Sequence, residues 1–224
     1  YPDIIYIQSE SNLGFAGGNN LGFRVAKGKY ILMLNNDTEV EPDFLEPLVD
    51  KMESHAEIGI VSPKIRFYYT PDTLQYVGYE SINPITQRGV AKGFRAEDFG
   101  QYDDAAESSY GPRTPMINPM HVIKEVALMA DVFFLYSDAI DWAHRIRNAG
   151  YKIYYVHNSM VYHKESISTC GRVSALRAYY MTRNRILYLR RNFTGFTYFL
   201  ALIYQIFVAI PKNAVTSAIK GGPK

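Results

Sequence analysis

The chain of 224 residues lacks several features that mark well-known protein classes. It contains one cysteine, Cys170, so an internal disulfide bond is excluded and a reducing compartment is favoured. The G-x-G-x-x-G fingerprint of dinucleotide-binding folds and the P-loop are both missing, and no internal repeat or low-complexity tract is present. What remains is an ordinary globular composition, with 47% hydrophobic and 21% charged residues and enough length for a sizeable core.

Acidic residues are absent from Gly171 onward. That region carries nine lysines and arginines, whereas the first 170 residues carry 15 basic and 22 acidic residues. A basic face of this kind suits phosphates, either in a nucleic acid or at a membrane surface. No nucleic-acid-binding motif accompanies the charge, so no nucleic-acid partner is expected.

Charged residues are also missing from positions 193 to 210, a run of 18 residues at the lower limit for a transmembrane helix. Basic residues on both sides, with Tyr198 and Tyr204 inside the run, better suit a helix that lies in the membrane interface. A core helix or a contact in a homo-oligomer is the alternative.

Glycine and asparagine are concentrated near the start, where residues 12 to 37 have the sequence NLGFAGGNNLGFRVAKGKYILMLNND. Gly14, Gly17 and Gly18 predict a turn that approaches a ligand closely, followed by a helix whose free N–H groups face a phosphate. Residues 30 to 34 form an apolar run short enough for a buried strand. Asp37 then lies just beyond the carboxyl end of this strand, where ligands bind in open α/β sheets. An ordinary Asn/Asp turn before a helix is the alternative.

A second polar stretch lies between Phe133 and His163. Its spacing predicts a helix over Asp138–Asn148, ended by Gly150 and followed by a strand. His157 falls in an expected turn. Further elements are expected as a strand over Ile4–Gln8, a helix over Pro42–Ser54, strands over Ile58–Ser62 and Lys64–Tyr68, a flap over Lys164–Thr169 and a helix over Arg172–Asn192. Residues 69 to 120 show little periodicity.

These stretches resemble glycosyltransferase family 2, the inverting enzymes of the GT-A fold, and especially the branch that adds rhamnose, galactofuranose and similar sugars to bacterial surface glycans. The first stretch is similar to the family's N-x-G-F-A-x-G-x-N turn and acidic strand end. The second is similar to F-L-Y-x-[ED]-D-x-D-x-x-x-R, and Tyr179-Tyr180-x-x-Arg183-Asn184 is similar to a third motif.

The resemblance implies an α/β fold of GT-A type, with a mostly parallel sheet flanked by helices. It implies a catalytic domain over residues 1–170, from which the upstream nucleobase-binding βαβ part of the family is missing, and a basic and apolar helical region over residues 171–224. It also implies a nucleoside-diphosphate sugar donor, a lipid-linked or polysaccharide acceptor, and a peripheral location at the cytoplasmic face of the plasma membrane.

The resemblance assigns roles to individual residues. Asp37 and His163 are the expected ligands of Mn²⁺ or Mg²⁺, which oxygen and imidazole groups both suit. The residues expected to contact the nucleotide sugar are Asn12, Gly14, Phe15, Gly17, Gly18, Asn19, Asn35, Asn36, Tyr180, Arg183 and Asn184.

The family's general base falls on an alanine in this chain, because Asp138-Ala139 stands where the resemblance places an acidic pair. Alanine cannot take a proton from an acceptor hydroxyl. Replacement of an aspartate at position 139 is favoured, since the neighbouring pattern is intact. A natural pseudoenzyme, or a base at Asp138 or Asp141, is the alternative, although Asp141 also fits a first-turn acid stabilised by the helix dipole.

Two other functional classes fit less well. One is a non-catalytic scaffold that binds a sugar nucleotide or glycan, which a natural Ala139 would favour. The other is a different nucleotide-using α/β enzyme, which the missing phosphate-binding fingerprints disfavour.

Overall fold

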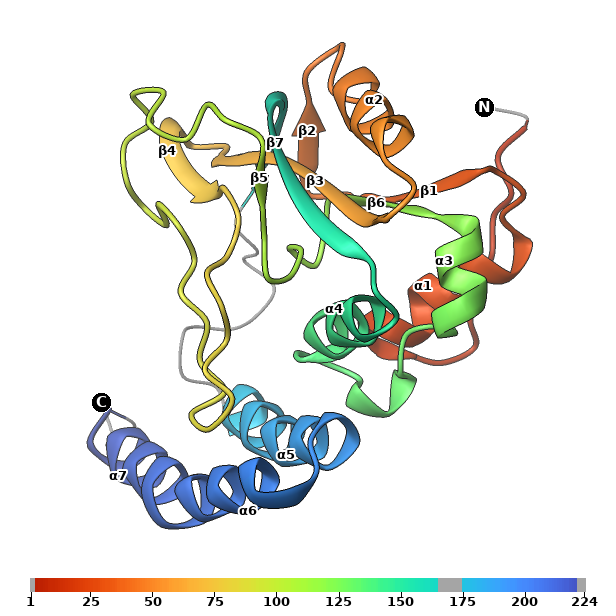
Figure 1. Cartoon of the computed structure of the whole chain (residues 1–224). Coiled ribbons are helices and arrows are strands. Elements are labelled where there is room, and N and C mark those ends of the chain that lie inside the picture. Colours follow the sequence, from red (N-terminus) through yellow and green to blue (C-terminus); the bar gives the residue numbers. More distant parts are fainter. Residues whose placement is uncertain (1–2, 165–174, 221–224) are drawn as a thin grey trace.

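The structure is a computed structural model, and it describes residues 3–164 and 175–220. Within these ranges a β-sheet lies between helices, and the C-terminal helices extend from one side (Figure 1). In chain order, the elements are α1 (Gly14–Val25), β1 (Tyr30–Met33), β2 (Thr38–Val40), α2 (Glu46–Ser54), β3 (Ile58–Phe67), β4 (Thr70–Tyr76), β5 (Ala106–Glu107), β6 (Met116–Pro119), α3 (Met120–Val126), η1 (Asp131–Phe133), α4 (Asp138–Asn148), β7 (Lys152–His163), α5 (Ala175–Asn192), α6 (Gly195–Tyr204), η2 (Gln205–Ala209) and α7 (Ile210–Lys220).

The sheet is mixed, not mostly parallel as expected, although the α/β class is confirmed. Its strands follow the order β1-β6-β3-β7-β2, with β4 paired to β3 and β5 to β7. In the described residues only β3 and β7 run parallel, and the other pairings are antiparallel. An apolar run indicates that a strand is buried, but it carries no information on the direction of the partner. Short connections, such as the turn between β3 and β4, make neighbouring strands antiparallel.

The central pair β3 and β7 replaces several shorter elements that the sequence predicts. β3 is one strand where two were expected, and it is buried along almost its whole length. Its register against β7 shifts between Pro63, which lies opposite Val156, and Lys64, which lies opposite Met160. Three residues of β7, including His157, therefore bulge out of the pairing, so the expected turn is a bulge within a continuous strand.

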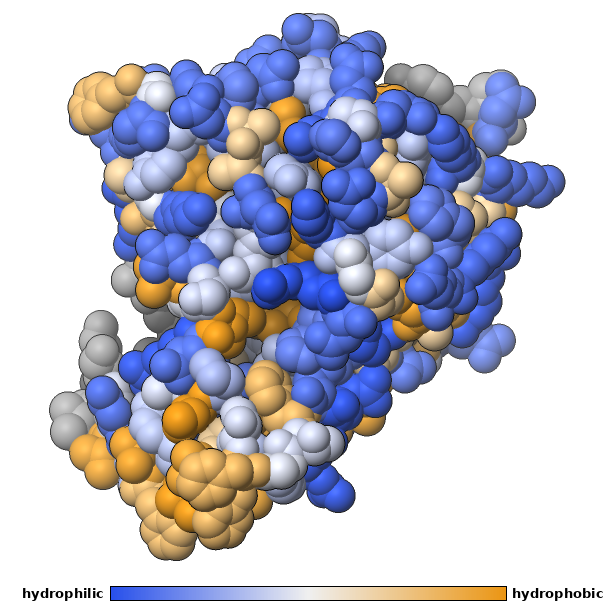
Figure 2. All heavy atoms as spheres, in the orientation of Figure 1, coloured by the Kyte–Doolittle hydropathy of each residue, from blue (hydrophilic) through white to orange (hydrophobic). Residues whose placement is uncertain are grey.

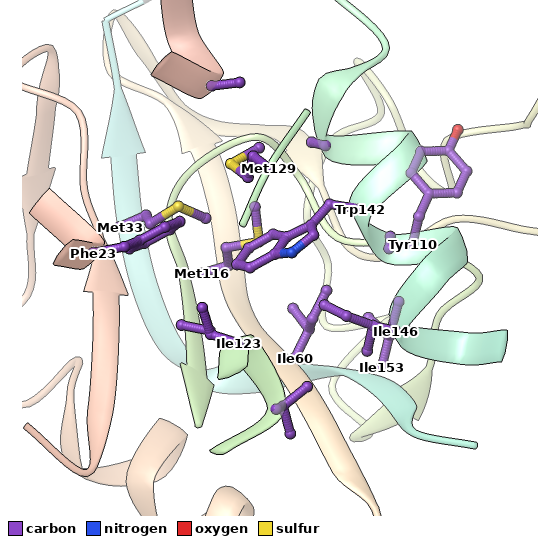
Figure 3. Close-up of a cluster of buried hydrophobic side chains, with 14 residues drawn as sticks. Phe23, Met33, Ile60, Tyr110, Met116, Ile123, Met129, Trp142, Ile146 and Ile153 are labelled. Carbon is purple, nitrogen blue, oxygen red and sulfur yellow. The ribbon is translucent and has the colours of Figure 1, made fainter. Parts of the chain in front are cut away.

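Helices α1, α3 and α4 pack on one face of the sheet around Trp142 (Figure 3). The Trp142 ring stacks on Phe23 of α1 with 5.5 Å between ring centroids. Its Nε1–H donates to the carbonyl of Ala127 at 3.0 Å, so the buried indole is hydrogen-bonded. Helix α2 covers the opposite face through Leu48 and Met52. The sheet is thus buried on both faces, as its apolar strands require.

Other expected boundaries hold in part. Helix α4 has the expected bounds, whereas α2 begins at Glu46 and not at Pro42. The expected strand over Ile4–Gln8 is not formed, and its apolar side chains are 39 to 79% exposed. No described strand pairs with this segment, and a strand without a partner leaves its backbone groups to solvent. The unpatterned residues 69 to 120 contribute β4, β5 and β6.

The C-terminal region is helical, as expected. Helix α5 packs against α4 and η1, and α6, η2 and α7 form one continuous helical stretch. Apolar side chains gather over these C-terminal helices at the lower left of the molecule (Figure 2). Large exposed apolar residues there are Phe196, Phe199, Ile203, Ile206, Phe207, Val208 and Val215. Among the described residues, Gly195–Thr216 is the helix that is long and apolar enough to cross a membrane by length and composition alone.

A buried ion network ties the loop after β4 to the central sheet. Lys64 of β3 is 2% exposed and contacts Asp98 (2.9 Å) and Asp103 (2.5 Å), and Arg66 contacts Asp98 (2.5 Å). Burial alone would raise the pKa of Asp98, but its hydrogen bonds with Lys64, Arg66 and the Gly100 N–H outweigh this and lower the pKa to about 2.

We expect Asp98→Asn to lower the free energy of unfolding by roughly 2 kcal/mol near neutral pH. A depressed carboxylate pKa stabilises the fold fully above the unfolded value of 3.8, and this stability is lost as pH falls through about 2. Urea unfolding across this pH range measures the effect. The control is Asp104→Asn at an exposed position. An equal loss in both variants would contradict the role of the network.

Candidate functional site

The two expected metal ligands lie side by side where β7 ends. Thr38 of β2 pairs with His163 of β7, and the Lys164 N–H donates to the carbonyl of Asp37 (2.8 Å). This register brings His163 Nε2 within 3.4 Å of Asp37 Oδ1. The two side chains are 20% and 33% exposed, yet Asp37 Oδ1 is itself buried and has no hydrogen-bond partner within the described ranges. A buried carboxylate oxygen without a hydrogen bond is costly unless a cation or a donor lies against it.

The donor set at Asp37 and His163 suits a divalent cation shared with a substrate. The described residues contain no group of three or more His, Cys, Asp or Glu side chains that could hold a metal alone. Mg²⁺ commonly binds through one or two carboxylates together with substrate phosphates and water. An imidazole also suits Mn²⁺. The pair fits a cation whose shell a diphosphate completes.

Asn35 and Asn36 lie beside this pair, in the turn between β1 and β2. The hydroxyl of Thr38 donates to the carbonyl of Asn35 (2.5 Å) and so fixes the turn. The Asn36 side chain is exposed and Asn35 is partly buried. Both residues therefore lie next to Asp37 in the turn that follows β1, and their contact with a ligand stays a prediction. The predicted flap after His163 falls almost wholly on residues 165–174, outside the described residues.

The expected glycine turn is instead the first part of helix α1. The helix begins at Gly14, which has a positive φ of 70°, and a Cβ at this position would collide with the carbonyl oxygen of Phe134. Asn12 Oδ1 accepts from the Gly14 N–H (2.9 Å), and the Phe134 carbonyl accepts from the Phe15 N–H (3.1 Å). Two of the free N–H groups predicted to face a phosphate are therefore used within the protein, so here Gly14 permits a close approach of two protein segments.

The later residues of the glycine motif have different surroundings. Gly17 packs against Leu13, and a Cβ added there would lie 2.7 Å from the Leu13 Cβ. Gly18 has open space around it, and together with Asn19 it lines a surface groove of about 410 Å³ between α1 and β1. Gly14 and Phe15 line the same groove, so a ligand in it can reach these four members of the motif.

A strained turn leads into α4. Phe134, Tyr136 and Ser137 have φ angles of 59°, 66° and 65°, which residues with a Cβ rarely adopt. Asn184 of α5 is fully buried, and its Nδ2 donates to three carbonyl groups of this turn at 2.7 to 3.0 Å. Such strain persists only where the surroundings fix it. The three hydrogen bonds of Asn184 therefore hold the turn in its strained conformation.

The other two residues of that motif also support the turn. Arg183 donates to the carbonyl of Val132 (2.9 Å) and to Asn184 Oδ1 (3.2 Å). Tyr180 stacks on Phe134, with 5.3 Å between ring centroids. Their observed partners belong to η1 and the turn after it, so the motif connects α5 to the start of α4.

The strained turn delivers Asp138 to the first position of α4. Its side chain is fully buried, and its two oxygens accept from Arg113 Nη2 (3.0 Å) and from the Ala139 N–H (2.8 Å). Burial raises the pKa of Asp138, and the adjacent Arg113 opposes the shift. Arg113 lies over the Phe15 ring at 4.2 Å, which links this site to the start of α1.

A cavity of about 270 Å³ adjoins Asp138. It is bounded by the loop after β4, the segment before β6, the start of α4, and α5. Its lining residues are Tyr79, Ile82, Gln87, Tyr110, Gly111, Arg113, Tyr136, Ser137, Asp138, Ala139, Ile140, Met181, Arg185 and Tyr188. Ala139, at the expected position of the general base, lies in this wall, and Asp138 is the carboxylate that lines it.

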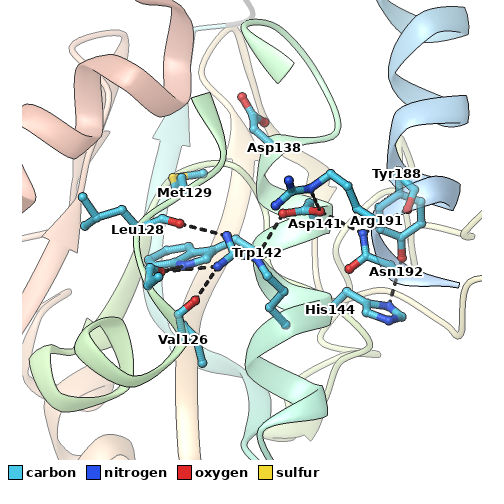
Figure 4. A network of polar contacts seen from close by, with 12 residues as sticks. Val126, Leu128, Met129, Asp138, Asp141, Trp142, His144, Tyr188, Arg191 and Asn192 are labelled. Carbon is cyan, nitrogen blue, oxygen red and sulfur yellow. Dashed lines mark hydrogen bonds and ion pairs between the residues drawn. The ribbon is translucent and has the colours of Figure 1, made fainter. Parts of the chain in front are cut away.

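Asp141 has a different environment from Asp138. It is fully buried and accepts from Arg145 Nε (3.1 Å), Arg191 Nε (3.0 Å) and Asn192 Nδ2 (2.8 Å), as Figure 4 shows for the contacts with α5. It does not line the cavity. These contacts tie α4 to α5 and account for the burial of the charge, so the observed role of Asp141 is structural.

Sequence reasoning missed Arg113 and most of the cavity wall. Arg113 lies in the segment without periodicity, and no partner spaced along the chain identifies it. Its one signal is position, between Gly111-Pro112 and Thr114-Pro115, where a restricted backbone can hold a polar side chain. The loop residues Tyr79, Ile82 and Gln87 carry no comparable signal.

Residues 1–101 match the family model of glycosyl transferase family 2. The low-salt glycan biosynthesis hexosyltransferase Agl10 of Haloferax volcanii is 24% identical over 198 residues, which cover 84% of this chain and 60% of that protein. An uncharacterized protein of Mycobacterium bovis is 44% identical over 55 residues, 23% of this chain and 21% of that protein. The chain therefore spans less than two thirds of these relatives. Together the matches support glycosyltransferase family 2.

A solved structure is similar over most of the chain. GalNAc-T7 with UDP, GalNAc and Mn²⁺ superposes with a TM-score of 0.61 at 15% identity, covering 83% of this chain and 38% of that one. At this identity the likeness shows the fold alone. It confirms the expected GT-A architecture.

We expect Asp141→Asn to lower the free energy of unfolding by about 3 kcal/mol, because it leaves two arginines without their shared counter-charge. Chemical denaturation measures the loss. Asp50→Asn, at an exposed position, serves as the control and should stay within about 0.5 kcal/mol of the parent protein. Unchanged stability of Asp141→Asn would show that Asp141 does not anchor α5.

Proposed function

We propose that this chain is part of an inverting glycosyltransferase that takes its sugar from a nucleoside-diphosphate sugar. The sugar is rhamnose, galactofuranose or a similar hexose, and the acceptor is a lipid-linked or polysaccharide chain in cell-surface glycan synthesis. The main support is the Asp37–His163 pair with its unsatisfied carboxylate oxygen, found on a GT-A fold. The similarity to a hexosyltransferase of glycan biosynthesis agrees with this proposal.

Asp37 and His163 would hold Mn²⁺ or Mg²⁺ at the sheet edge. The similar GalNAc-T7 structure contains Mn²⁺ and UDP, which supports a divalent cation here. A cation bound by these two residues would neutralise the charge that develops on a diphosphate leaving group. Asn35, Asn36, Gly18 and the neighbouring α1 residues would contact the rest of the donor.

The acceptor hydroxyl would lie in the cavity beside α4. Inverting transfer requires a carboxylate within hydrogen-bond reach of that hydroxyl. Residue 139 lines the cavity at the start of the helix, but an alanine side chain cannot accept the proton. We therefore propose that the base has been replaced at Ala139. Asp138 also lines the cavity, but its oxygens are engaged by Arg113 and by the helix backbone, which suits orientation more than proton transfer.

The apolar C-terminal helices would rest on a membrane surface, at its cytoplasmic face. Gly195–Thr216 exposes large aromatic and aliphatic side chains, and only 17% of its apolar window is buried. Lys212 lies within it, where its charge would meet anionic head groups. A scaffold that binds a sugar nucleotide without transferring sugar is the second candidate, and Ala139 favours it if the alanine is natural.

The metal assignment is tested with His163→Ala. We expect the affinity for UDP or GDP in the presence of Mn²⁺ to fall at least about tenfold, since even outer-shell partners of a metal contribute this much. Calorimetric titration with and without Mn²⁺ measures it, and affinity without metal should stay unchanged. The control is His55→Ala, at an exposed position. Equal effects in both variants would refute the assignment.

The base assignment is tested by sugar transfer from a panel of nucleotide sugars with Mn²⁺. Ala139→Asp should raise the transfer rate by about 100-fold or more, as expected for a positioned general base. Ala139→Asn has nearly the same shape without the base and should remain as slow as the parent. If donor binds but neither variant gains activity, the scaffold is favoured instead. Thermal unfolding of both variants shows whether the larger side chain is tolerated.

A further inference from the structure

The cavity beside Asp138 is lined by two arginines, of which Arg185 has no counter-charge among the described residues. Arg113 and Arg185 both line it, whereas Asp138 is its one carboxylate and is already paired with Arg113. Arg185 lies on the partly buried side of α5 and, within the described residues, makes no hydrogen bond or ion pair. Burial lowers the pKa of Arg185, and the nearby Arg88 lowers it further. A half-buried guanidinium beside a second cation is unfavourable unless an anion joins them.

Two further polar atoms of the cavity wall lack partners. Arg113 Nε and Gln87 Oε1 are both buried, and neither has a hydrogen-bond partner in the described part of the chain. Buried polar atoms are nearly always satisfied in folded proteins, so an unsatisfied donor and an unsatisfied acceptor on residues that line one cavity indicate a polar ligand. The donor of Arg113 and the charge of Arg185 suit phosphate oxygens, while the acceptor of Gln87 suits a hydroxyl.

The remaining wall is apolar and aromatic. Tyr79 and Tyr110 stack at 3.9 Å between ring centroids, and Ile140 and Tyr188 lie in the same wall. A second cavity of about 200 Å³ shares Ile82, Tyr110, Ile140 and Tyr188 with the first. It reaches Phe193, which lies two residues before the start of α6.

The arrangement therefore leads from the two arginines to the exposed apolar helix. The loop after β4, yellow in Figure 1, descends to α5, and Gln205 of η2 donates to its Thr86 carbonyl (3.4 Å). One end of the path holds the two arginines, and its middle is mostly apolar, although His144 and Arg147 also border it. Its far end meets the surface that we propose rests on a membrane. A ligand that matches this order carries a phosphate next to an apolar chain.

We infer that this cavity binds the phosphate of a lipid-linked acceptor, with Arg185 and Arg113 as its cationic contacts and the apolar path as the route of the lipid. The inference rests on the proposed function and selects the lipid-linked acceptor over a free polysaccharide. The cavity volume is close to the lower end of ligand pockets, roughly 300 Å³, which suits a phosphate with one sugar better than a long glycan.

The test uses the full chain and three probes in calorimetric titration below their micelle concentrations. Dodecyl phosphate carries both charge and chain, dodecyl glucoside carries the chain alone, and inorganic phosphate carries the charge alone. We expect dodecyl phosphate to bind at least about tenfold more tightly than either other probe, which is the effect of one charge-assisted hydrogen bond. Equal binding of the two dodecyl probes would overturn the inference.

Variants on α5 locate the effect. Arg185→Gln should abolish the preference for dodecyl phosphate, whereas Arg185→Lys should keep most of it. Arg190→Gln removes the same charge from an exposed position of the same helix and should change nothing. Equal losses in Arg185→Gln and Arg190→Gln would show that the surface charge binds, not the cavity. Thermal unfolding confirms that each variant is folded.

A final arm distinguishes the acceptor phosphate from the donor diphosphate. UDP and GDP with Mn²⁺ should bind Arg185→Gln as tightly as the parent protein and should not displace dodecyl phosphate. Displacement, with an equal loss of nucleotide affinity in the variant, would assign the cavity to the donor and overturn the inference. Absence of nucleotide binding in the parent protein would count against the proposed function. The preference for dodecyl phosphate over dodecyl glucoside could still be measured in that case, so the two proposals fail separately.

Discussion

The parallel pairing of β3 with β7 is the constraint on which the site depends. β7 carries His163 at its end, and its antiparallel pairing with β2 places that residue beside Asp37. β7 also directly follows α4, so its position in the sheet fixes where the helix packs and where Asp138 begins it. The bulge in β7 takes up the three extra residues between the partners of Pro63 and Lys64. Beyond it, β3 and β7 pair in register as far as Phe67 and His163. A one-residue slip would turn His163 to the opposite face.

Helix α5 is the second determinant, because it supports the site as well as leading to the apolar helices. Asn184 fixes three carbonyl groups of the strained turn, and Asp141 binds both Arg191 and Asn192. The same helix supplies Arg185 to the cavity. The proposed division at residue 170 therefore separates two stretches of sequence that share one site, whereas the apolar surface begins only with α6.

The sequence predicts best those helices and strands whose positions are set by the pattern of neighbouring residues. Helix α4 and the apolar strand before Asp37 were expected where they are found, since their spacing and polarity are decided within a few residues. Strand direction and pairing were not predicted, because they depend on partners far along the chain. The Asp37–His163 pair came from resemblance, and Arg113 was missed because only the tertiary fold brings it to Asp138. The glycine motif was assigned to a ligand although Gly14 accommodates the Phe134 carbonyl.

The arginines of helix α5 differ in whether the protein supplies them with a partner. Asp141 neutralises Arg191 and also Arg145, which removes them from any role in ligand binding. Arg183 is bound to backbone carbonyl and amide oxygens. Arg185 has no such partner among the described residues, although part of its surface is buried. The acidic residues of the first 170 positions thus compensate only part of the basic C-terminal region, and among the described residues Arg185 is a half-buried cation that they leave unpaired at the cavity.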